Sequence, residues 1–485
     1  MNSLPEKHDT YQNPLVDRYA SPEIACLFSD KNRHTTWRRL WIALAEAEHE
    51  VGLKSITKAQ IDEMKAHLDD IPYDKVRELE SRIRHDVMAH LRVFGEQCPT
   101  ARPIMHLGAT SAYVLDNTDL IIMCSALDII KRRLMGVIDA LSKQARAHRD
   151  LVTVAFTHYQ PAQLTTVGKR VCLWLQDFLL DLEDLEYRVK TLKFRGVKGA
   201  TGTQDSFMAL MDGDSGKIKK LEELVAKKMG FSASYPVTGQ TYSRKIDSQI
   251  LAILSGMAQS AHKFSNDVRL LQNLREAEEP FEAEQVGSSA MPYKRNPVLS
   301  ERIASLARLV ICGSMNPAFT AAGQWFERTL DDSANRRISI PEAFLATEGL
   351  LNVAHNIAAG LKINPKIIER HVKDELPFMA TERILMESVK GGGDRQALHE
   401  RIRIHAMESA RLIKEEGKDN DLLDRIARDP AFSTVLSKKQ LDQILEPRKF
   451  IGRAPEQVDD FLKEAVAPVL KRYKHLVDKP VRLTV

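Results

Sequence analysis

Apolar residues recur through the middle of the chain at alternating steps of three and four, and the pattern continues unbroken over several helical turns. This is the period of helices that wind around one another, and seams of such length are typical of long rods in a helical bundle. We therefore predict long helices over residues 120–141, 171–192 and 250–271. Their seams consist of Leu120, Met123, Leu127, Ile130, Leu134, Val137 and Leu141, then Val171, Leu175, Phe178, Leu182, Leu185, Val189 and Leu192, and then Ile250, Leu254, Met257, Ala261, Phe264, Val268 and Leu271.

The second of these segments carries further apolar residues beside its seam, at Leu173, Trp174, Leu179 and Leu180. More than one face of this helix is then expected to be buried, which favours contacts between subunits and therefore an oligomer. Pro161 suits the first position of a helix, so we place the start of the second helix there.

The segments on either side of this bundle are expected to be helical but more broken. Prolines interrupt the first part of the chain, and the glycines of residues 391–393 and the pair Asp429-Pro430 interrupt the last part. No strand-like alternation runs far enough to predict a major sheet. We predict an all-α fold of three helical domains, with boundaries at residues 1–111, 112–363 and 364–485, of which the middle one is the long-helix bundle.

Composition narrows the class of protein. The mean hydropathy is -0.30, and the longest apolar stretches are too short to span a bilayer, so we expect no membrane segment. The opening MNSLPEKHDT lacks a secretory signal, and the five cysteines are scattered without the spacing of a metal site, which together favour the cytoplasm. We expect these cysteines to be small core residues. A net charge of +4 is too even for a nucleic-acid binder, so any anion site must be local.

Candidate chemistry is expected where glycines, hydroxyls and charged residues collect, because a bundle helix needs few of them. Five segments stand out in this way. They are Arg84 to Asp86, Gly108 to Ser111 with Asp116 and Asn117, Thr157 to Gln163, Gly287 to Pro297, and Glu327 to Arg337.

The segment GSSAMPYKRNP at residues 287–297 is the most specific of the five, and its composition predicts a mobile polar loop. It resembles the signature loop Gly-Ser-Ser-x-Met-Pro-x-Lys-x-Asn-Pro of the fumarase, aspartase and argininosuccinate lyase superfamily at every fixed position. Further segments resemble the adenylosuccinate lyase family within that superfamily. They are RHDVMAH from Arg84, FTHYQPAQ from Phe156, TGQTYSRK from Thr238 and LDDSANRR from Leu330.

The resemblance implies a homotetramer whose central bundle is shared, with active sites assembled from different subunits. It also implies the reaction: elimination of fumarate from adenylosuccinate to give AMP, and from the succinylated imidazole carboxamide ribotide of purine synthesis. We expect small nucleotide substrates, no metal and no organic cofactor, since the chain has no cysteine and histidine cluster, phosphate loop or dinucleotide fingerprint.

Such an elimination needs a base for a carbon-bound proton and an acid for the departing nitrogen. The resemblance implies Ser288 as the base, which has to be ionised with help from Lys294 and loop N–H groups, and Ser289 stays open as the alternative. It implies His158 as the acid, with His85 as a rival that we assign to substrate contact beside Asp86. Taken alone, Ser288 would be read as a loop or capping residue and His158 as a surface histidine.

Two carboxylates and a phosphate on the substrate require an arginine-rich pocket. The resemblance implies a binding set for the phosphate and ribose, a set for the succinyl group, and Arg328 as a further substrate contact. The first set is Arg18, Tyr19, Arg302, Ser333 and Arg337, the second is Thr110, Ser111, Gln240, Lys294 and Asn296, and Arg84, His85 and Asp86 are further contacts.

Two alternatives stay open at this point. One is another fumarate-releasing lyase of the superfamily, such as argininosuccinate lyase or fumarase, which would not need the phosphate contacts. The other is a non-catalytic structural protein on the same fold, because a fold does not establish a function.

Overall fold

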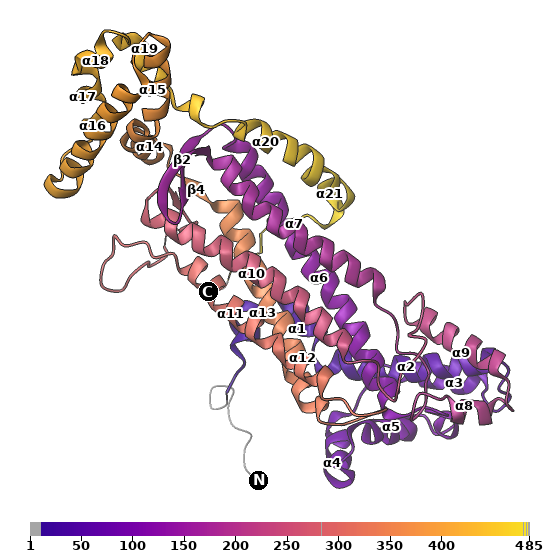
Figure 1. Cartoon of the computed structure of the whole chain (residues 1–485). Helices are drawn as coiled ribbons and strands as arrows, with labels where there is room; N and C mark the ends of the chain where they lie inside the picture. Colours follow the sequence, from indigo (N-terminus) through magenta and orange to yellow (C-terminus); the bar gives the residue numbers. More distant parts are fainter. Residues whose placement is uncertain (1–10, 283, 479, 482, 484–485) are drawn as a thin grey trace.

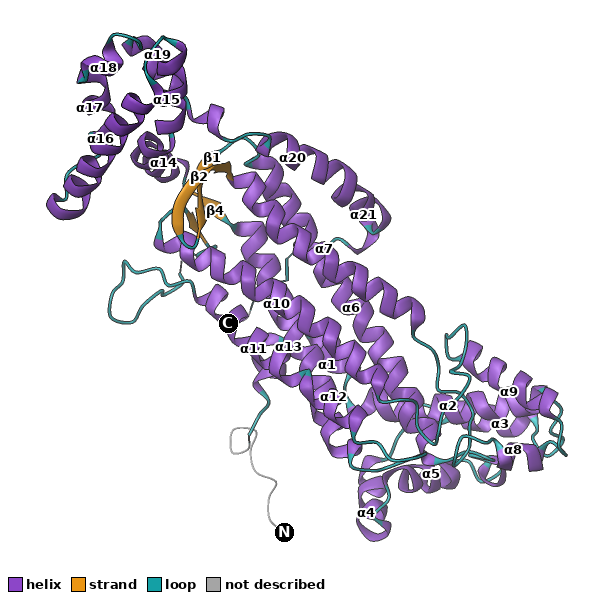
Figure 2. Cartoon of the chain, viewed as in Figure 1, coloured by secondary structure: helices purple, strands orange, loops and turns teal. Residues whose placement is uncertain are grey.

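The longest helices run side by side and form an elongated rod through the middle of the molecule (Figure 1). The computed structural model describes residues 11–282, 284–478, 480–481 and 483. Helices dominate these residues, so the predicted all-α fold is confirmed (Figure 2). The rod consists of α6 (Ser111–Ala147), α7 (Val167–Thr191), α10 (Lys245–Asn273), α11 (Val298–Gly313), α12 (Met315–Ala322) and α13 (Asp332–Gly360).

The three predicted seams lie within α6, α7 and α10, apart from Leu192, which caps the end of α7. Their residues belong to one large core, and most are completely buried. Of the apolar residues beside the second seam, Trp174 and Leu179 are buried within the chain, whereas Leu173 and Leu180 are 49% and 53% exposed. One side of the second seam, with Trp174 and Leu179, is therefore covered by this chain. The other side, with Leu173 and Leu180, is left half exposed.

The predicted start of the second long helix at Pro161 is wrong. Pro161 lies in strand β2 (Gln160–Thr166), which pairs antiparallel with β1 (Val152–Thr157), and α7 begins only after the Thr166 side chain caps it. The β-branched residues around Val154 favour an extended chain over a helix. The described residues contain one further pair of strands, β3 (Ala277–Glu278) with β4 (Lys362–Ile363), so the expectation of no major sheet is confirmed.

The N-terminal helices and a later segment share a second core at one end of the rod. Apolar residues of α2 and α5 pack there with residues 194–226, which follow α7 in the sequence. The elements of this end are η2 (Leu15–Tyr19), α1 (Pro22–Leu27), α2 (Asp30–Glu50), α3 (Lys58–Ala66), α4 (Tyr73–Ile83), α5 (Asp86–Gln97), η3 (Arg102–Ile104), α8 (Asp205–Leu210) and α9 (Ser215–Lys228).

The chain beyond residue 364 first forms a separate small core and then returns to the rod (Figure 1). The returning residues Val458, Leu462 and Val466 are buried in the large core, beside α7. The predicted domain boundaries at residues 111 and 363 stay predictions. The elements here are α14 (Pro365–Met379), α15 (Thr381–Lys390), α16 (Arg395–Glu416), α17 (Leu422–Arg428), α18 (Pro430–Ser433), α19 (Lys438–Ile444), η4 (Pro447–Phe450), α20 (Ala454–Phe461), η5 (Leu462–Val466), α21 (Ala467–Arg472) and η6 (Lys474–Leu476).

Two further expectations concern the membrane and the cysteines. Within the described part of the chain, none of the helices combines the length and the apolar character needed to cross a bilayer. All five cysteines are free thiols, but only Cys98 and Cys172 are buried, while Cys26 and Cys312 are exposed. The expectation that all five are core residues is therefore wrong.

Candidate active site

His158 stands at the tip of the β1–β2 hairpin. Thr157 pairs with Gln160, so His158 and Tyr159 form a two-residue loop, and their φ angles are 53° and 57°. A loop with two positive φ angles normally contains asparagine or glycine, because other side chains are strained there. The chain nevertheless holds an exposed imidazole in this position. Such local strain is typical of a functional residue.

The signature loop lies where α10 ends and α11 begins. The Ser288 hydroxyl accepts a hydrogen bond from the Met291 backbone N–H over 3.2 Å, and Ser289 is more exposed than Ser288. The Asn296 side-chain amide donates to the Gly287 carbonyl over 2.8 Å, and this bond joins the first and last parts of the loop. A Cβ added to Gly287 would lie 2.3 Å from the Lys294 carbonyl oxygen, so only glycine fits there.

Lys294 itself is exposed and forms no ion pair with any residue that the structure describes. Lys294 and the loop residues that follow it, Arg295 and Asn296, line a cavity together with polar residues of α10. The Gln272 side chain, near the end of α10, donates to the Arg295 carbonyl over 2.9 Å and fixes the loop to that end of the helix.

At the opposite end of the rod, the N-termini of α5, α6 and α13 meet. The His85 Nδ1 caps α5 by accepting the Met88 N–H over 3.3 Å, and its Nε2 lies 3.4 Å from the Ser111 hydroxyl at the start of α6. The Arg337 guanidinium donates to Asp86 over 2.7 Å. Helix N-termini carry partial positive charge, so their convergence favours an anion.

Arg84 precedes this meeting point directly. It ends α4 with a φ of 52°, in the left-handed region that residues other than glycine rarely adopt, and its side chain is exposed. The sharp reversal at Arg84 is what lets His85 begin α5. Thr110 occupies the position before α6, and its side chain makes no capping hydrogen bond.

A cavity beside these helix ends is rich in arginine. Three of the predicted substrate contacts, Arg328, Ser333 and Arg337, line it together. Arginines outnumber aspartates five to three among the residues lining the cavity. The remaining charged lining residues are Arg33, Asp116, Asp119, Arg244, Asp332 and Arg336.

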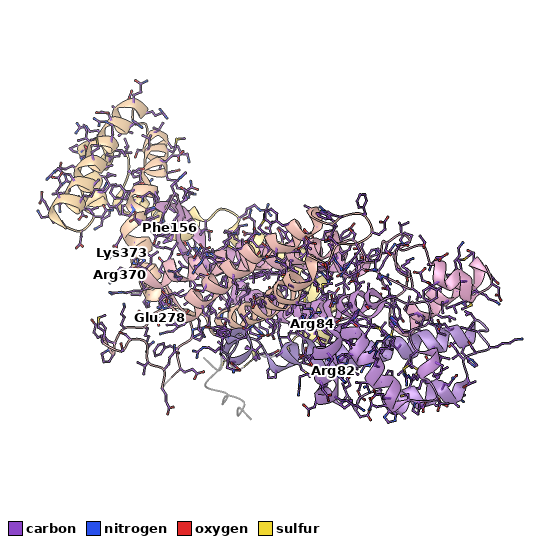
Figure 3. The ribbon with its side chains drawn as sticks, turned by 90° about the horizontal axis from the view of Figure 1, so that it is seen from below. Arg82, Arg84, Phe156, Glu278, Arg370 and Lys373 are labelled. Atoms are coloured by element: carbon purple, nitrogen blue, oxygen red, sulfur yellow. The ribbon has the colours of Figure 1, made fainter. Side chains whose placement is uncertain are left out.

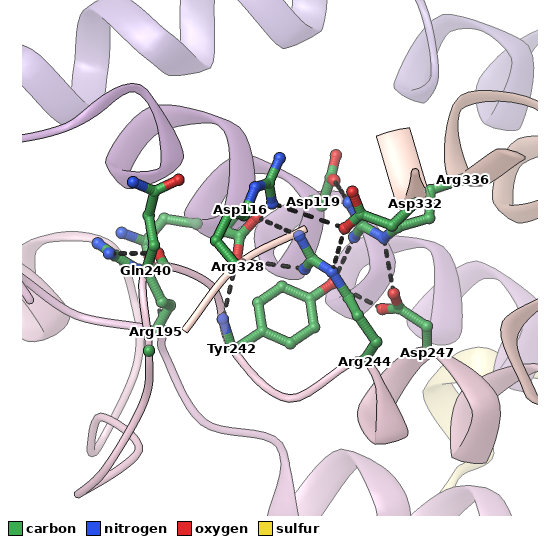
Figure 4. A network of polar contacts seen from close by, with 12 residues as sticks. Asp116, Asp119, Arg195, Gln240, Tyr242, Arg244, Asp247, Arg328, Asp332 and Arg336 are labelled. Atoms are coloured by element: carbon green, nitrogen blue, oxygen red, sulfur yellow. Dashed lines mark hydrogen bonds and ion pairs between the residues drawn. The ribbon is translucent and has the colours of Figure 1, made fainter. Parts of the chain in front are cut away.

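Behind the cavity lies a buried network of ion pairs (Figure 4). Arg244 binds Asp116 through both terminal nitrogens, at 3.2 and 3.0 Å, and binds Asp332 through Nε at 2.6 Å. Burial alone would lower the pKa of Arg244, but Asp116, Tyr242 and Asp247 together raise it, and the net shift of the pKa is upward. These residues lock α6, the start of α10 and the start of α13 together.

Arg336 forms the second half of the network. It binds Asp247 at 2.7 Å, the Tyr242 hydroxyl at 2.6 Å and Asp119 at 3.0 Å, and Asp119 also binds Arg33 at 2.8 Å. Burial would raise the pKa of Asp119, but Arg33 and Arg336 hold it below its usual range. Asp119 therefore stays ionised between two guanidinium groups.

The other predicted binding residues fall into two places. Arg18, Tyr19 and Arg302 line a separate cavity on α11 and η2, with the Arg302 guanidinium 5.9 Å from the centre of the Tyr19 ring. Gln240 lies near the arginine-rich end, where its backbone N–H donates to the Glu327 carbonyl over 3.0 Å and its side chain donates to the Ala200 carbonyl.

The predicted site residues do not meet within one chain. His85 contacts Ser111 at the first residue of α6, whereas His158 follows the last residue of that helix, which has 37 residues. At 1.5 Å per residue, α6 separates the two histidines by about 55 Å. Figure 3 shows this separation too, since Phe156 and Arg84 lie well apart along the molecule. The 29 residues of α10 likewise put about 43 Å between the signature loop and the arginine-rich end.

Several residues of the arginine-rich end were not predicted from the sequence. Asp332 and Arg336 lie within a segment that the sequence singles out, but without a role of their own. Arg33 and Arg244 lie in or beside ordinary helices, where an arginine is usually a surface residue. Because the paired charges are far apart along the chain, no short stretch of sequence indicates that they form a network.

Comparisons with known proteins cover the whole chain. A family model described as "Lyase" matches residues 20–312, and one described as "Adenylosuccinate lyase C-terminus" matches residues 377–461. The chain is 50% identical to adenylosuccinate lyase of Saccharomyces cerevisiae over 99% of both chains. It is 49% identical to adenylosuccinate lyase of Schizosaccharomyces pombe, over 97% of this chain and 98% of the relative.

Solved structures show the same fold at lower identity. The 3-carboxy-cis,cis-muconate lactonizing enzyme of Pseudomonas putida superposes with a TM-score of 0.79 at 23% identity, covering 96% of this chain and all of that one. A fumarate lyase of Mesorhizobium sp. BNC1 gives 0.78 at 21% identity, covering 94% of this chain and all of that one.

Proposed function

This chain belongs to the adenylosuccinate lyase family, and from that premise we propose how its residues carry out the reaction of the family. It is a carbon–nitrogen lyase that eliminates fumarate from adenylosuccinate, leaving AMP, and from the succinylated imidazole ribotide of purine synthesis. The main structural observation that supports this function is the arginine-rich cavity, which lies where the N-termini of three helices converge. A phosphate with a charge of about -1.5 to -2 suits such a cavity, so the lyase alternatives without phosphate contacts are disfavoured.

His158 is the general acid in this proposal. During elimination the carbon–nitrogen bond breaks, and the imidazole donates a proton to the departing nitrogen of the purine. Two features support the assignment. The side chain is exposed at a hairpin tip, and two successive residues there, His158 and Tyr159, have strained positive φ angles. An outward-pointing tip is suited to reach a site that other parts of the protein form.

Ser288 is the base. Its ionised hydroxyl takes the carbon-bound proton, and the electron pair left behind forms the double bond of fumarate as the nitrogen departs. The hydrogen bond that Ser288 accepts from the Met291 N–H supports the assignment, because a donor aimed at the oxygen favours its ionised form. Lys294 supplies positive charge nearby in the same loop, and Ser289, without such a donor among the described residues, is the less favoured alternative.

The binding residues follow the chemistry of the substrate. We assign the phosphate and ribose to Arg18, Tyr19, Arg302, Ser333 and Arg337, and the succinyl carboxylates to Thr110, Ser111, Gln240, Lys294 and Asn296. Arg84, His85 and Asp86 orient the substrate, and Arg328 binds one of its anionic groups. The position of His85 supports this, because its Nδ1 is engaged by the Met88 N–H and its Nε2 faces Ser111 at the start of α6.

We infer a homotetramer with shared sites, and the separation of these groups within one chain supports an assembly of several copies. A site that needs both His158 and His85 has to draw them from different copies, since α6 holds them apart in one chain. Exposed apolar side chains support such an assembly. On α7, Leu173, Leu180 and Tyr187 recur every seven residues along one helix face and are 49%, 53% and 64% exposed. Near α12, Phe319, Trp325 and Phe326 are 70%, 71% and 102% exposed.

The cytoplasm is the compartment that fits this function. The five free cysteines support a reducing environment, because secreted proteins tend to pair theirs. No metal or organic cofactor enters the proposed steps, in which every proton is moved by a protein side chain.

The test is a direct assay. Purified protein is mixed with adenylosuccinate, and the fall of its ultraviolet absorbance is followed while fumarate and AMP are separated by chromatography. Release of both products in equal amounts is the expected result. A folded, tetrameric protein that leaves adenylosuccinate intact but cleaves argininosuccinate would contradict the proposal, and inactivity on both would favour a structural role.

A further inference from the structure

Among the ion pairs of the buried network behind the arginine-rich cavity, carboxylates outnumber buried guanidinium groups. Its carboxylates are Asp116, Asp119, Asp247 and Asp332, and its buried guanidinium groups are Arg244 and Arg336. The remaining charge is balanced by two arginines at the rim, Arg33 and Arg328, whose side chains are 22% and 20% exposed. The rim arginines are therefore held at the cavity by charges below them.

Asp332 is the carboxylate beneath Arg328. It is 1% exposed, and its Oδ2 lies 2.6 Å from the Arg244 Nε and 3.6 Å from an Arg328 terminal nitrogen (Figure 4). Its other oxygen, Oδ1, is buried without a hydrogen-bond partner among the described residues. An ionised carboxylate buried in this way needs positive charge close by, which favours keeping Arg328 beside it.

Arg328 does not belong to a helix or strand that would fix its side chain. It belongs to an irregular stretch between α12 and α13, where Trp325 and Phe326 are largely exposed. Asp332 is the only acidic partner of Arg328 in the part of the chain that the structure describes. Asp332 itself is rigid, because it begins α13 and is bound by Arg244, which Asp116 holds at two points.

We propose that Asp332 is a positioning residue, which holds the Arg328 guanidinium at the cavity in the orientation that binds the anionic substrate. It does so without touching the substrate, by linking the buried Arg244–Asp116 pair to a side chain on the irregular stretch between α12 and α13. This inference rests on the proposed function, since it takes Arg328 as a substrate contact. An arginine that is oriented before binding loses less side-chain entropy when the ligand arrives.

The first test replaces Asp332 by asparagine, which keeps the shape and one acceptor for Arg244 but removes the charge. We expect Asp332→Asn to raise KM for adenylosuccinate about tenfold and to change kcat less than about threefold, because ground-state and transition-state binding are weakened alike. The matched control is Asp247→Asn, another buried carboxylate of the network, which contacts Arg336 and Tyr242 but no proposed substrate residue. It is expected to lower the melting temperature similarly while KM stays within about twofold.

A double-mutant cycle separates positioning from general loosening. In an Arg328→Gln background, Asp332→Asn is expected to have no further effect on KM, because the residue it acts through is gone. An undiminished effect in that background, or an equal rise of KM in Asp247→Asn, overturns the proposal. Wild-type turnover of adenylosuccinate is measured beside the variants, so a failure of the proposed function is seen separately.

A measurement on the wild-type protein covers the case in which Asp332→Asn does not fold. A crystal structure of the wild-type tetramer with AMP and fumarate should show Arg328 in contact with a product while it still contacts Asp332. An Arg328 that has turned away from Asp332 to reach the product contradicts the proposal.

Discussion

The Arg337 guanidinium at the start of α13 donates to the Asp86 carboxylate at the start of α5 over 2.7 Å, although 251 residues separate the two along the chain. The Arg337 side chain remains 61% exposed, so Asp86 orients it without covering it. Its other nitrogens are turned toward solvent at the arginine-rich cavity. The pair thus presents a guanidinium that a phosphate can still bind.

Replacing Arg337 by glutamine should weaken substrate binding. We expect Arg337→Gln to raise KM by about 10- to 100-fold, which is the range for losing one hydrogen bond to a charged group, while kcat changes much less. The measurement is steady-state kinetics with adenylosuccinate. Asp86→Asn should give a smaller rise in KM, because the arginine remains but is less fixed. A normal KM in Arg337→Gln would place the phosphate elsewhere.

Replacing His158 should act on the chemical step. His158→Gln is expected to lower kcat by about 10² to 10⁴, the usual effect of losing a general acid, with KM nearly unchanged. The matched control is Tyr159→Phe, at the other position of the same hairpin tip, which should keep near-normal turnover. Near-normal turnover by His158→Gln would exclude it as the acid and direct attention to His85.

The two serines of the signature loop can be told apart in the same assay. Ser288→Ala is expected to abolish measurable turnover, because the proton acceptor is removed, whereas Ser289→Ala should keep most of the activity. Binding of AMP by calorimetry checks that both variants retain a formed site. Full activity in Ser288→Ala together with loss in Ser289→Ala would reverse the assignment.

Shared active sites predict that two impaired variants repair each other when the substrate concentration is far below the KM of Arg337→Gln, where both variants are slow. His158→Gln and Arg337→Gln alter opposite ends of the rod, so a mixed assembly contains some sites with neither change. Mixing the two after partial dissociation, and then reassembling them, should raise activity severalfold above Arg337→Gln, the more active of the two. The control mixes each variant with itself by the same procedure. No gain in assemblies shown by mass spectrometry to be mixed would mean that each chain builds its own site.

Glu48 predicts a dependence of stability on pH that is separate from catalysis. The side chain is fully buried, neither oxygen has a partner among the described residues, and burial raises its pKa to about 9. A carboxyl whose pKa is higher in the folded state binds more protons there. Its contribution to stability is therefore complete below about pH 4 and is lost at about 1.4 kcal/mol per pH unit as the pH rises toward 9.

Glu48→Gln removes this loss. We expect the free energy of unfolding to increase by roughly 2 to 4 kcal/mol at pH 8, with the gain shrinking toward pH 5. Denaturant unfolding at pH 5, 6.5 and 8 measures it. The control Glu50→Gln alters a half-exposed carboxylate that pairs with Lys228, and should change stability by less than about 1 kcal/mol at each pH. A gain that does not vary with pH would contradict the raised pKa.

The long helices could be predicted because their signal is local. Every seam residue except Val189 is buried, and the three-and-four spacing of these residues is visible in the sequence, so α6, α7 and α10 follow from periodicity. The β1–β2 hairpin could not, because its two-residue loop contains His158 and Tyr159 in place of the asparagine and glycine that mark such turns. The start of α7 was therefore predicted wrongly at Pro161, which lies in β2.

The candidate site shows the same limit at longer range. Motif resemblance indicates the chemistry of Ser288 and His158, but it contains no information on how far α6 carries His158 from His85. The ion-pair network is harder still, since Asp116, Arg244 and Asp332 come from distant segments and each resembles a surface residue on its own. Only the packing of α6, α10 and α13 brings them together.

The crowding at Gly287 also has a genetic meaning. Every amino acid other than glycine carries a Cβ, and here that atom would meet a backbone oxygen, which cannot rotate aside as a side chain can. Any substitution at this position therefore has to shift the backbone of the loop, whatever the chemistry of the new residue. Alanine, the mildest exchange, already has to displace the backbone of the loop, so a survey of natural or induced variants should find this codon unvaried among functional copies.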